Sequence, residues 1–128
     1  MTTAIDREIR VAFWKIHILH HAAKQSVYGL WLLEELAHHG HHVSPGTLYP
    51  LLNRMETNGW LRSSSPRGSK ARRSYRITAS GRKVLDELRH EIVELHLEVV
   101  RGKEPQPAQR AGAARKARGR RSSGGGGR

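Results

Sequence analysis

The apolar residues of this chain change from helical to alternating spacing after Gly59, and this change constrains the fold more than any other feature. Before Gly59, three segments have apolar residues three or four positions apart, which predicts amphipathic helices. After it, residues 60–62 and 73–77 predict two short strands, joined by a turn that contains Pro66 and Gly68. A long helical pattern follows, so the chain is expected to be mainly α with a small β-hairpin.

The first predicted helix, residues 5–23, has two apolar stripes where a helix that covers one core needs a single stripe. The first stripe contains Ile5, Ile9, Ala12, Phe13, Ile16 and Leu19, and the second contains Val11, Trp14, Ile18 and Ala22. We therefore expect this helix to be buried on two sides, by the domain core and by either a second subunit or a ligand.

Capping residues predict the bounds of the second and third helices. Ser26 is a suitable N-cap for the second helix, and Gly40 lies where a left-handed residue would end it. Ser44 can cap the third helix, Pro45 suits its first position, and Gly59 follows its end. The predicted apolar face of the second helix consists of Val27, Leu30, Leu33, Leu36 and Ala37.

The third helix is predicted to bury one face and to present polar side chains on the other. Its buried stripe consists of Leu48, Leu51, Leu52 and Met55, and the opposite face carries Thr47, Tyr49, Asn53, Arg54 and Thr57. Pro50 lies within the helix, where proline costs about 3 kcal/mol, so we expect a kink or a loosened first turn.

Those polar residues suit the reading of base edges in DNA. Thr47 and Tyr49 carry hydroxyls that can bond phosphates or bases, as does the capping Ser44. Asn53 and Arg54 can each make bidentate base contacts worth about 1–3 kcal/mol of discrimination. The candidate recognition residues are therefore Ser44, Thr47, Tyr49, Asn53 and Arg54.

The predicted hairpin and its flanks are uniformly basic. No Asp or Glu lies between Thr57 and Leu85, whereas eight basic residues do: Arg62, Arg67, Lys70, Arg72, Arg73, Arg76, Arg82 and Lys83. Such a stretch indicates a polyanionic partner, most commonly nucleic acid, although a solvated surface face is the alternative. Arg67, Lys70, Arg72 and Arg73 are the candidate wing residues, which would set affinity and salt dependence more than sequence choice.

The last helix, predicted from the capping Thr78 to about Val100, carries a short heptad seam. Leu85, Leu88, Ile92, Leu95 and Val99 follow one another at spacings of three and four residues. This pattern favours a homodimer formed by the last helix and by the first helix with Trp14 and Ile18, because the first helix also needs a second cover. The alternative is that the seam packs on its own domain.

The predicted organisation is a DNA-binding domain at residues 1–78, a dimerisation helix at 79–101 and a disordered basic tail at 102–128. The tail has no apolar periodicity. Residues 101–128 hold +8 of the formal net charge of +12, so the domain itself is only mildly basic. The arginines of the tail could bind phosphates without sequence preference, or the tail could have no function beyond solubility.

Several classes of protein are excluded by what the sequence lacks. It has no cysteine, no apolar run of the about 20 residues that span a bilayer, and no start typical of a secretion signal. It has no phosphate-binding loop or catalytic arrangement in a recognisable frame, so we expect no enzyme activity and no cofactor. We expect a cytoplasmic, nucleoid-associated protein without membrane contact.

The order of helix, helix, polar helix and basic hairpin is typical of a winged helix-turn-helix domain that binds double-stranded DNA. Two other functions remain open at this point. The chain could coat DNA without sequence choice as an architectural protein, or it could use the domain to dock a protein partner. Only sequence-specific binding requires the polar face of the third helix.

The string Ser44-Pro45-Gly46-Thr47-Leu48-Tyr49-Pro50-Leu51-Leu52, followed by Arg54-Met55-Glu56, resembles the signature of PadR-like transcriptional regulators. Tyr28-Gly29, Gly59-Trp60-Leu61 and the segment from Arg73 to Thr78 with Gly81 resemble further parts of that family. The resemblance covers roughly residues 9–100 and accounts for a proline within the third helix.

The resemblance implies a homodimeric repressor of the short form, with one C-terminal dimerisation helix. Such proteins usually bind an operator of inverted half-sites and release it when an effector binds. Phenolic acids and cationic drugs are effectors of some members, so the resemblance implies a small hydrophobic or aromatic effector. By position, Trp14 and the last helix could line its site, although packing in the dimer core is the ordinary role for Trp14.

The chain has nine histidines, an unusual number for its length. His17 and His21 are one helical turn apart, a spacing that can chelate a metal, and His38, His39, His41 and His42 surround Gly40. A metal-responsive or pH-responsive regulator is therefore an alternative to an effector-released repressor. Against a metal site, no cysteine accompanies these histidines and the nearest carboxylates, Glu34 and Glu35, lie a turn away.

Overall fold

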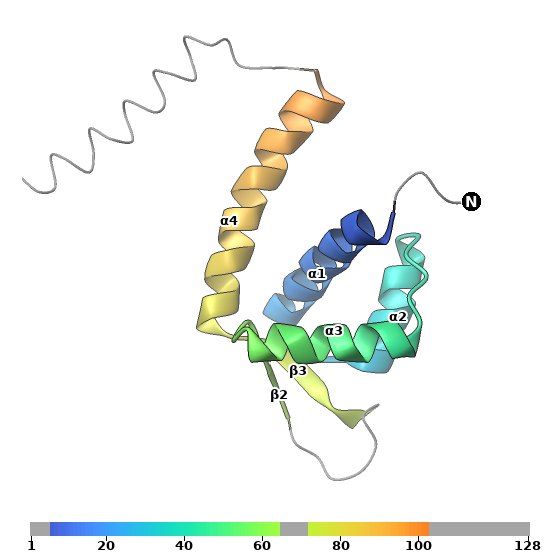
Figure 1. The fold of residues 1–128 in the computed structure, drawn as a ribbon. Coiled ribbons are helices and arrows are strands. Elements are labelled where there is room, and N and C mark those ends of the chain that lie inside the picture. Colours follow the sequence, from blue (N-terminus) through green and yellow to red (C-terminus); the bar gives the residue numbers. More distant parts are fainter. Residues whose placement is uncertain (1–5, 65–71, 103–128) are drawn as a thin grey trace, which may run out of the picture. The chain divides into compact units, whose positions relative to one another are not determined.

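The computed structural model describes residues 6–64 and 72–102 (Figure 1). In chain order, the elements are α1 (Arg7–Lys24), β1 (Val27–Tyr28), α2 (Gly29–His38), α3 (Pro45–Thr57), β2 (Leu61–Ser63), β3 (Ser74–Ile77) and α4 (Ala79–Leu95), followed by a π-helical turn at His96–Val100. The chain divides into two compact units, one ending at Arg89 and the other beginning at His90. The first unit therefore includes the N-terminal part of α4.

The three strands form one antiparallel sheet in the order β1-β3-β2. Leu61 pairs with Ile77 and Val27 pairs with Tyr75, which places Val27, Leu61 and Tyr75 in the core. The mainly helical fold with a small wing is confirmed, but the sequence predicted a hairpin and missed β1. Two residues are too few to show an alternating pattern.

The predicted start of the second helix is wrong. Val27 and Tyr28 are extended and pair with β3, so Ser26 cannot cap α2, whose N-cap position is taken by Tyr28 without a side-chain hydrogen bond. The predicted apolar face is wrong in part as well. Leu32 and Leu36 are fully buried in α2, whereas Leu30 is 56% exposed.

The C-terminal ends of α2 and α3 and the N-terminal ends of α3 and α4 are as predicted. Gly40 and Gly59 have φ angles of 85° and 83°, the left-handed conformation that ends α2 and α3. Ser44 occupies the N-cap position of α3 with Pro45 as the first helical residue. At the start of α4, the Thr78 Oγ1 accepts a hydrogen bond of 3.0 Å from the Gly81 backbone N–H. The helix α3 continues through Pro50.

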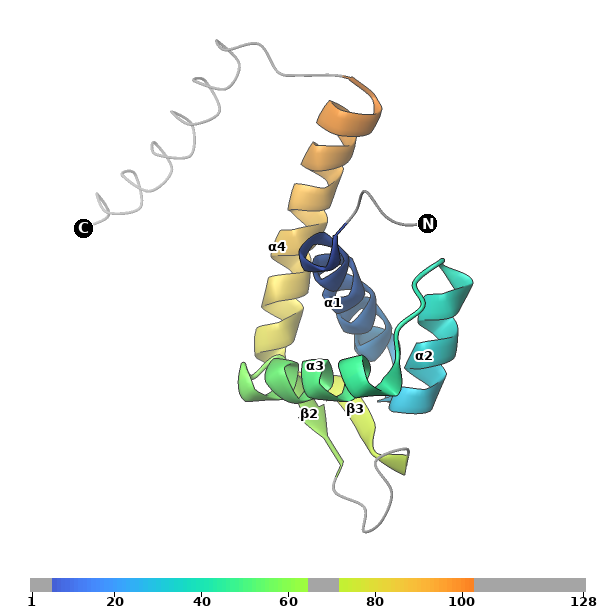
Figure 2. The same ribbon diagram turned by 45° about the vertical axis from the view of Figure 1, so that its right-hand side comes forward.

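The core of the first unit lies between α1, α2, α3 and the sheet, as Figures 1 and 2 show. The third-helix stripe Leu48, Leu51, Leu52 and Met55 is at most 1% exposed, as predicted. Burying a side chain of this size contributes about 1.5–3 kcal/mol, so these four residues fix the orientation of α3 firmly.

One of the two apolar stripes of α1 faces this core, and the other is exposed in its N-terminal part but buried at Leu19. Trp14, Ile18 and Ala22 are buried, whereas Ile9 and Phe13 are 50% and 48% exposed. Trp14 and Ile18 were predicted at a subunit interface. At 0% exposure, Ile18 offers no surface to a second subunit, and both residues instead pack in the core of their own chain.

The predicted seam of α4 is divided in the same way. Leu85 is 2% exposed and Leu88 is partly buried, and both pack against the core of the first unit. This corrects the prediction that Leu85 lies in a dimer interface. In the second unit, Ile92, Leu95 and Val99 are 40%, 58% and 69% exposed.

Several sequence-based predictions lie outside the described residues, among them Ile5, the wing residues Arg67 and Lys70, and the tail from residue 103. Within the described ranges, no helix combines the length and the apolar character needed to cross a membrane.

Gly81 is required by a close approach between α4 and the loop after α3. A Cβ at this position would collide with the Trp60 carbonyl oxygen and would lie 2.7 Å from the Ile77 Cγ1. We predict that Gly81→Ala lowers the free energy of unfolding by about 1–3 kcal/mol, because backbone must shift to admit the methyl group.

The control is Gly46→Ala in α3, where the nearest atom to a new Cβ is the Ser44 Oγ at 3.9 Å. It should leave stability unchanged or raise it, since alanine is about 1 kcal/mol better than glycine in a helix. Urea unfolding followed by circular dichroism measures both, and equal midpoints would contradict the close packing at Gly81.

Candidate nucleic-acid interface

The open face of α3 is set by its buried face. Asn53, Arg54 and Thr57 are exposed on α3, opposite the buried leucines. Figures 1 and 2 show the ends of β2 and β3 extending from α3 on the side away from α1. A polar helix face and a strand pair therefore lie next to each other, which is the arrangement that a winged-helix domain presents to DNA.

Tyr49 is the predicted recognition residue that the structure places differently. Its ring is partly buried against the core, and a Cβ on Gly29 would lie 2.5 Å from its Cε1. The glycine that begins α2 therefore makes room for this ring. Tyr49 supports the packing of α2 on α3 and presents only part of its ring on the open face.

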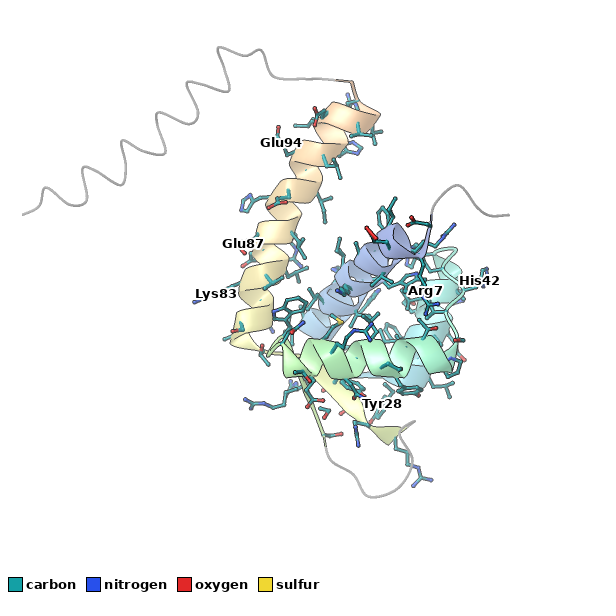
Figure 3. All side chains as sticks on the ribbon, viewed as in Figure 1. Arg7, Tyr28, His42, Lys83, Glu87 and Glu94 are labelled. Carbon is teal, nitrogen blue, oxygen red and sulfur yellow. The ribbon has the colours of Figure 1, made fainter. Side chains whose placement is uncertain are left out.

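The N-terminal end of α3 is joined to α1 by side-chain hydrogen bonds. Arg7 donates from Nη2 to the Thr47 Oγ1 over 2.9 Å, and the Ser44 Oγ donates to the same oxygen over 3.2 Å. Arg7, Arg10 and His42 line an open hollow here. Figure 3 shows Arg7 and His42 near the N-terminal end of α3. Sequence reasoning missed Arg7, because a contact over 40 residues leaves no local pattern.

The C-terminal end of α3 is tied to the wing by Glu56. Its Oε2 accepts hydrogen bonds from the Ser63 backbone N–H over 3.0 Å and from the Ser63 Oγ over 2.8 Å. This pair of bonds to one carboxylate fixes β2 relative to α3. The Glu56 carboxylate is therefore hydrogen-bonded within the domain and adds no unpaired negative charge to the basic surface.

The wing places like charges opposite each other. Arg62 of β2 and Arg76 of β3 are register partners, and both are exposed. They line a hollow together with Lys24 and Arg82, and none of the described residues that line it is acidic. Like charges directly opposite destabilise a strand pair, so this arrangement fits a surface that meets an anion. Of the predicted wing residues, Arg72 is exposed and Arg73 is half-buried.

The histidines that the sequence separates into two groups converge in space. His17 and His21 on α1 meet His39 after α2, and one ring nitrogen of each lies within 4.8 Å of the others. Glu35 joins them: its Oε2 is 3.5 Å from the His21 Nε2 and 3.2 Å from the His39 Nε2. The candidates His38 and His42 lie outside the group of three histidines, although the Nδ1 of the exposed His38 side chain is 4.0 Å from the Glu35 Oε1.

Burial lowers the pKa of four histidines in and around this cluster: His17, His20, His21 and His41. Neighbouring imidazoles add to the effect of burial. For His17, the charges of His41 and then His39 lower the pKa further. For His21, the Glu35 carboxylate opposes the shift without reversing it. The folded surroundings of these four imidazoles therefore disfavour their charged form.

Three comparisons bear on what this surface does. Residues 18–87 match the sequence model of the family described as "Transcriptional regulator PadR-like family". The transcriptional regulator Rv3488 of Mycobacterium tuberculosis (strain ATCC 25618 / H37Rv) is 50% identical over 97 residues, covering 75% of this chain and 91% of that protein.

Two solved structures are similar along most of their length. A PadR family transcriptional regulator from Eggerthella lenta DSM 2243 has a TM-score of 0.63 and 32% identity, covering 77% of this chain and 88% of that one. A PadR-like transcriptional regulator from Bacillus cereus strain ATCC 14579 has a TM-score of 0.57 and 29% identity, covering 70% and 92%.

We predict that acid destabilises the folded chain through these histidines. In the unfolded chain their pKa is the ordinary 6.5, and in the folded chain the pKa values of His17 and His41 lie lower. As the pH falls, the unfolded state therefore binds protons before the folded state does. The contribution of these histidines to the free energy of unfolding is full above pH 6.5 and is lost as the pH falls from 6.5 toward their lower pKa values in the folded chain.

The urea midpoint in metal-free buffer, measured from about pH 7.5 to about pH 5.5, tests this loss of stability. His17→Gln and His41→Gln should each flatten the dependence, because they remove a group whose pKa differs between the two states. A midpoint that does not change over this range, or that changes equally in the variants, contradicts the prediction.

Proposed function

The chain belongs to the PadR-like family of DNA-binding transcriptional regulators, and we propose that it recognises a specific operator as a homodimer and represses transcription there. The family's role is regulatory and not enzymatic. The observation that carries the proposal is the face of α3 on which Asn53 and Arg54 are exposed, held by a fully buried apolar stripe.

In this proposal α3 enters the major groove. Asn53 and Arg54 carry the planar groups that bind base edges with two hydrogen bonds each. Ser44, Thr47 and Arg7 at the N-terminal end of α3 would bind the phosphates beside the groove, where the helix dipole also favours negative charge. Tyr49 contributes the part of its ring that remains exposed.

The wing would bind the backbone next to the groove that α3 occupies. Arg72 and Arg73 lie at the start of β3, and Arg67 and Lys70 precede them in the sequence. Arg62 and Arg76 extend the basic surface along the strands. Contacts of this kind carry little sequence information but make the affinity fall steeply with salt.

The homodimer would cover the apolar surface that each unit leaves exposed. In the second unit this surface is Ile92, Leu95 and Val99, and in the first unit it includes Ile9 and Phe13 of α1. Contiguous exposed apolar side chains mark interaction sites in soluble proteins. A two-fold dimer places two recognition helices for inverted half-sites.

Release by a small hydrophobic or aromatic effector is the part of the proposal that rests most on the family resemblance. One local feature supports it. The Trp14 indole Nε1 is buried without a hydrogen-bond partner among the described residues, and Trp14 lines the hollow beside Arg7 and Arg10. A buried indole N–H normally has a partner, which an effector carrying an oxygen could supply.

We predict that Asn53→Ala and Arg54→Ala each cost about 1–3 kcal/mol of discrimination between operator and random DNA, because each removes a bidentate base contact. The control is Arg89→Ala, an exposed arginine on α4 that pairs with Asp86 over 3.3 Å. Fluorescence anisotropy at fixed salt compares the promoter DNA of the chain's own gene with a scrambled duplex of equal length.

Wild-type protein should prefer the promoter duplex, both α3 variants should lose that preference, and Arg89→Ala should keep it. Equal affinity of the wild type for both duplexes would support an architectural protein and contradict specific recognition. Intact preference in the α3 variants would exclude α3 as the recognition helix.

We predict that Leu95→Glu converts the dimer into folded monomers, because it places an unpaired carboxylate in an apolar interface. Val93→Glu is the matched control, since Val93 is 60% exposed on the same helix but lies off the seam. Sedimentation equilibrium measures the mass and circular dichroism the helix content. A wild-type monomer, or equal loss of the dimer in both variants, would contradict the proposed interface.

A further inference from the structure

The histidine cluster between α1 and α2 has no part in the proposed reading of DNA. We propose that His17, His21, His39 and Glu35 bind one divalent first-row transition metal ion per chain, of which zinc is the representative. All four side chains belong to the first compact unit, so the site is complete within one chain.

The distances fit a tetrahedral site. With metal–nitrogen bonds of about 2.0–2.1 Å, neighbouring ligand atoms in a tetrahedron lie about 3.4 Å apart. The Glu35 Oε2 already lies 3.5 Å from the His21 Nε2 and 3.2 Å from the His39 Nε2. A ring nitrogen of His17 lies within 4.8 Å of those of His21 and His39, so in this proposal an ion would draw His17 closer to the other ligands.

The elements place these ligands without strain on the backbone. His17 and His21 are one turn apart on α1, and their rings are stacked with centroids 6.4 Å apart. His39 follows the last turn of α2, one turn beyond Glu35 on the same helix. Two ligands from each of two packed segments is a common way to build a site between helices.

The chemistry of the ligands selects the class of ion. Three imidazoles and one carboxylate suit zinc, nickel, cobalt or copper, whereas calcium and magnesium prefer oxygen ligands alone. A metal binds an unprotonated nitrogen of a neutral imidazole, and the three histidines of the cluster can each supply one.

The alternative is that Glu35 serves only as a hydrogen-bond acceptor for the histidines. That role accounts for His21 and His39, which lie beside the carboxylate, but not for His17, whose ring nitrogen converges on theirs. A second observation also points to a ligand. The His41 Nδ1 is buried without a hydrogen-bond partner among the described residues, and its ring lies 5.1 Å from that of His17. A buried unpaired nitrogen beside the cluster fits an incompletely filled polar site.

The site lies where it could matter to the helix-turn-helix. His39 begins the turn that leads to α3, so an ion would join α1 to the end of α2 next to that turn. Binding of the ion does not depend on the proposed function, and the experiment below needs no DNA.

The experiment uses the full chain, free of any affinity tag and stripped of metal with a chelator. Isothermal titration with zinc chloride measures stoichiometry and affinity, and X-ray absorption at the zinc edge counts the imidazole ligands. The variants are His17→Gln and His39→Gln, which remove a ligand from each segment. The matched control is His42→Gln, which lies in the same stretch of sequence but outside the cluster.

We expect saturable binding of one zinc ion per chain, with three imidazoles in the absorption spectrum of the wild type. His17→Gln and His39→Gln should each weaken binding at least tenfold, since loss of even an outer-shell partner costs about 10–100-fold. The control variant His42→Gln should bind as the wild type does.

Absence of saturable zinc binding, a spectrum without histidine ligands, or equal weakening in the ligand and control variants would each overturn the proposal. The wild-type spectrum keeps the test decisive even if a ligand variant fails to fold. Failure of DNA binding in the earlier experiment would leave this result unaffected.

Discussion

The orientation of α3 depends on one constraint, the burial of Leu48, Leu51, Leu52 and Met55 against α1, α2 and the sheet. Those four side chains occupy one side of the helix, which leaves Asn53 and Arg54 on the open side. The bonds of Thr47 to Arg7 and of Glu56 to Ser63 then hold the two ends of α3. A loosened stripe would therefore change the DNA-facing surface as well as the stability.

Sequence reasoning could predict features that depend on neighbouring residues, such as an apolar period or a helix cap. The stripe of α3, the left-handed glycines at positions 40 and 59 and the capping Thr78 all follow local rules, and the structure has them. It failed where a feature depends on contacts between residues that are far apart in the sequence. The strand β1 forms by pairing with β3. Because of this pairing, the N-cap position of α2 is Tyr28 and not the predicted Ser26.

The candidate sites show the same limit. Polar residues on one helix could be grouped by period, but the contact of Arg7 with Thr47 and the meeting of His39 with His17 arise from packing between helices. Glu35 was set aside as a turn away from the histidines, yet it lies beside two of them, because α2 packs on α1. The net charge was the least specific guide, since most of it belongs to the tail.

The apolar seam of α4 has a continuous spacing in the sequence but two different environments in the structure. Leu85 belongs to the core of its own unit, whereas the seam residues of the second unit remain exposed: Ile92, Leu95 and Val99. In our account the exposed part joins two chains so that two α3 helices meet one duplex. Hydroxyl-radical footprinting of the promoter tests this most directly. The account predicts two protected, inverted half-sites with centres about 10–10.5 base pairs, or a multiple of this, apart. Uniform protection without sequence preference, or a single protected half-site, would contradict it.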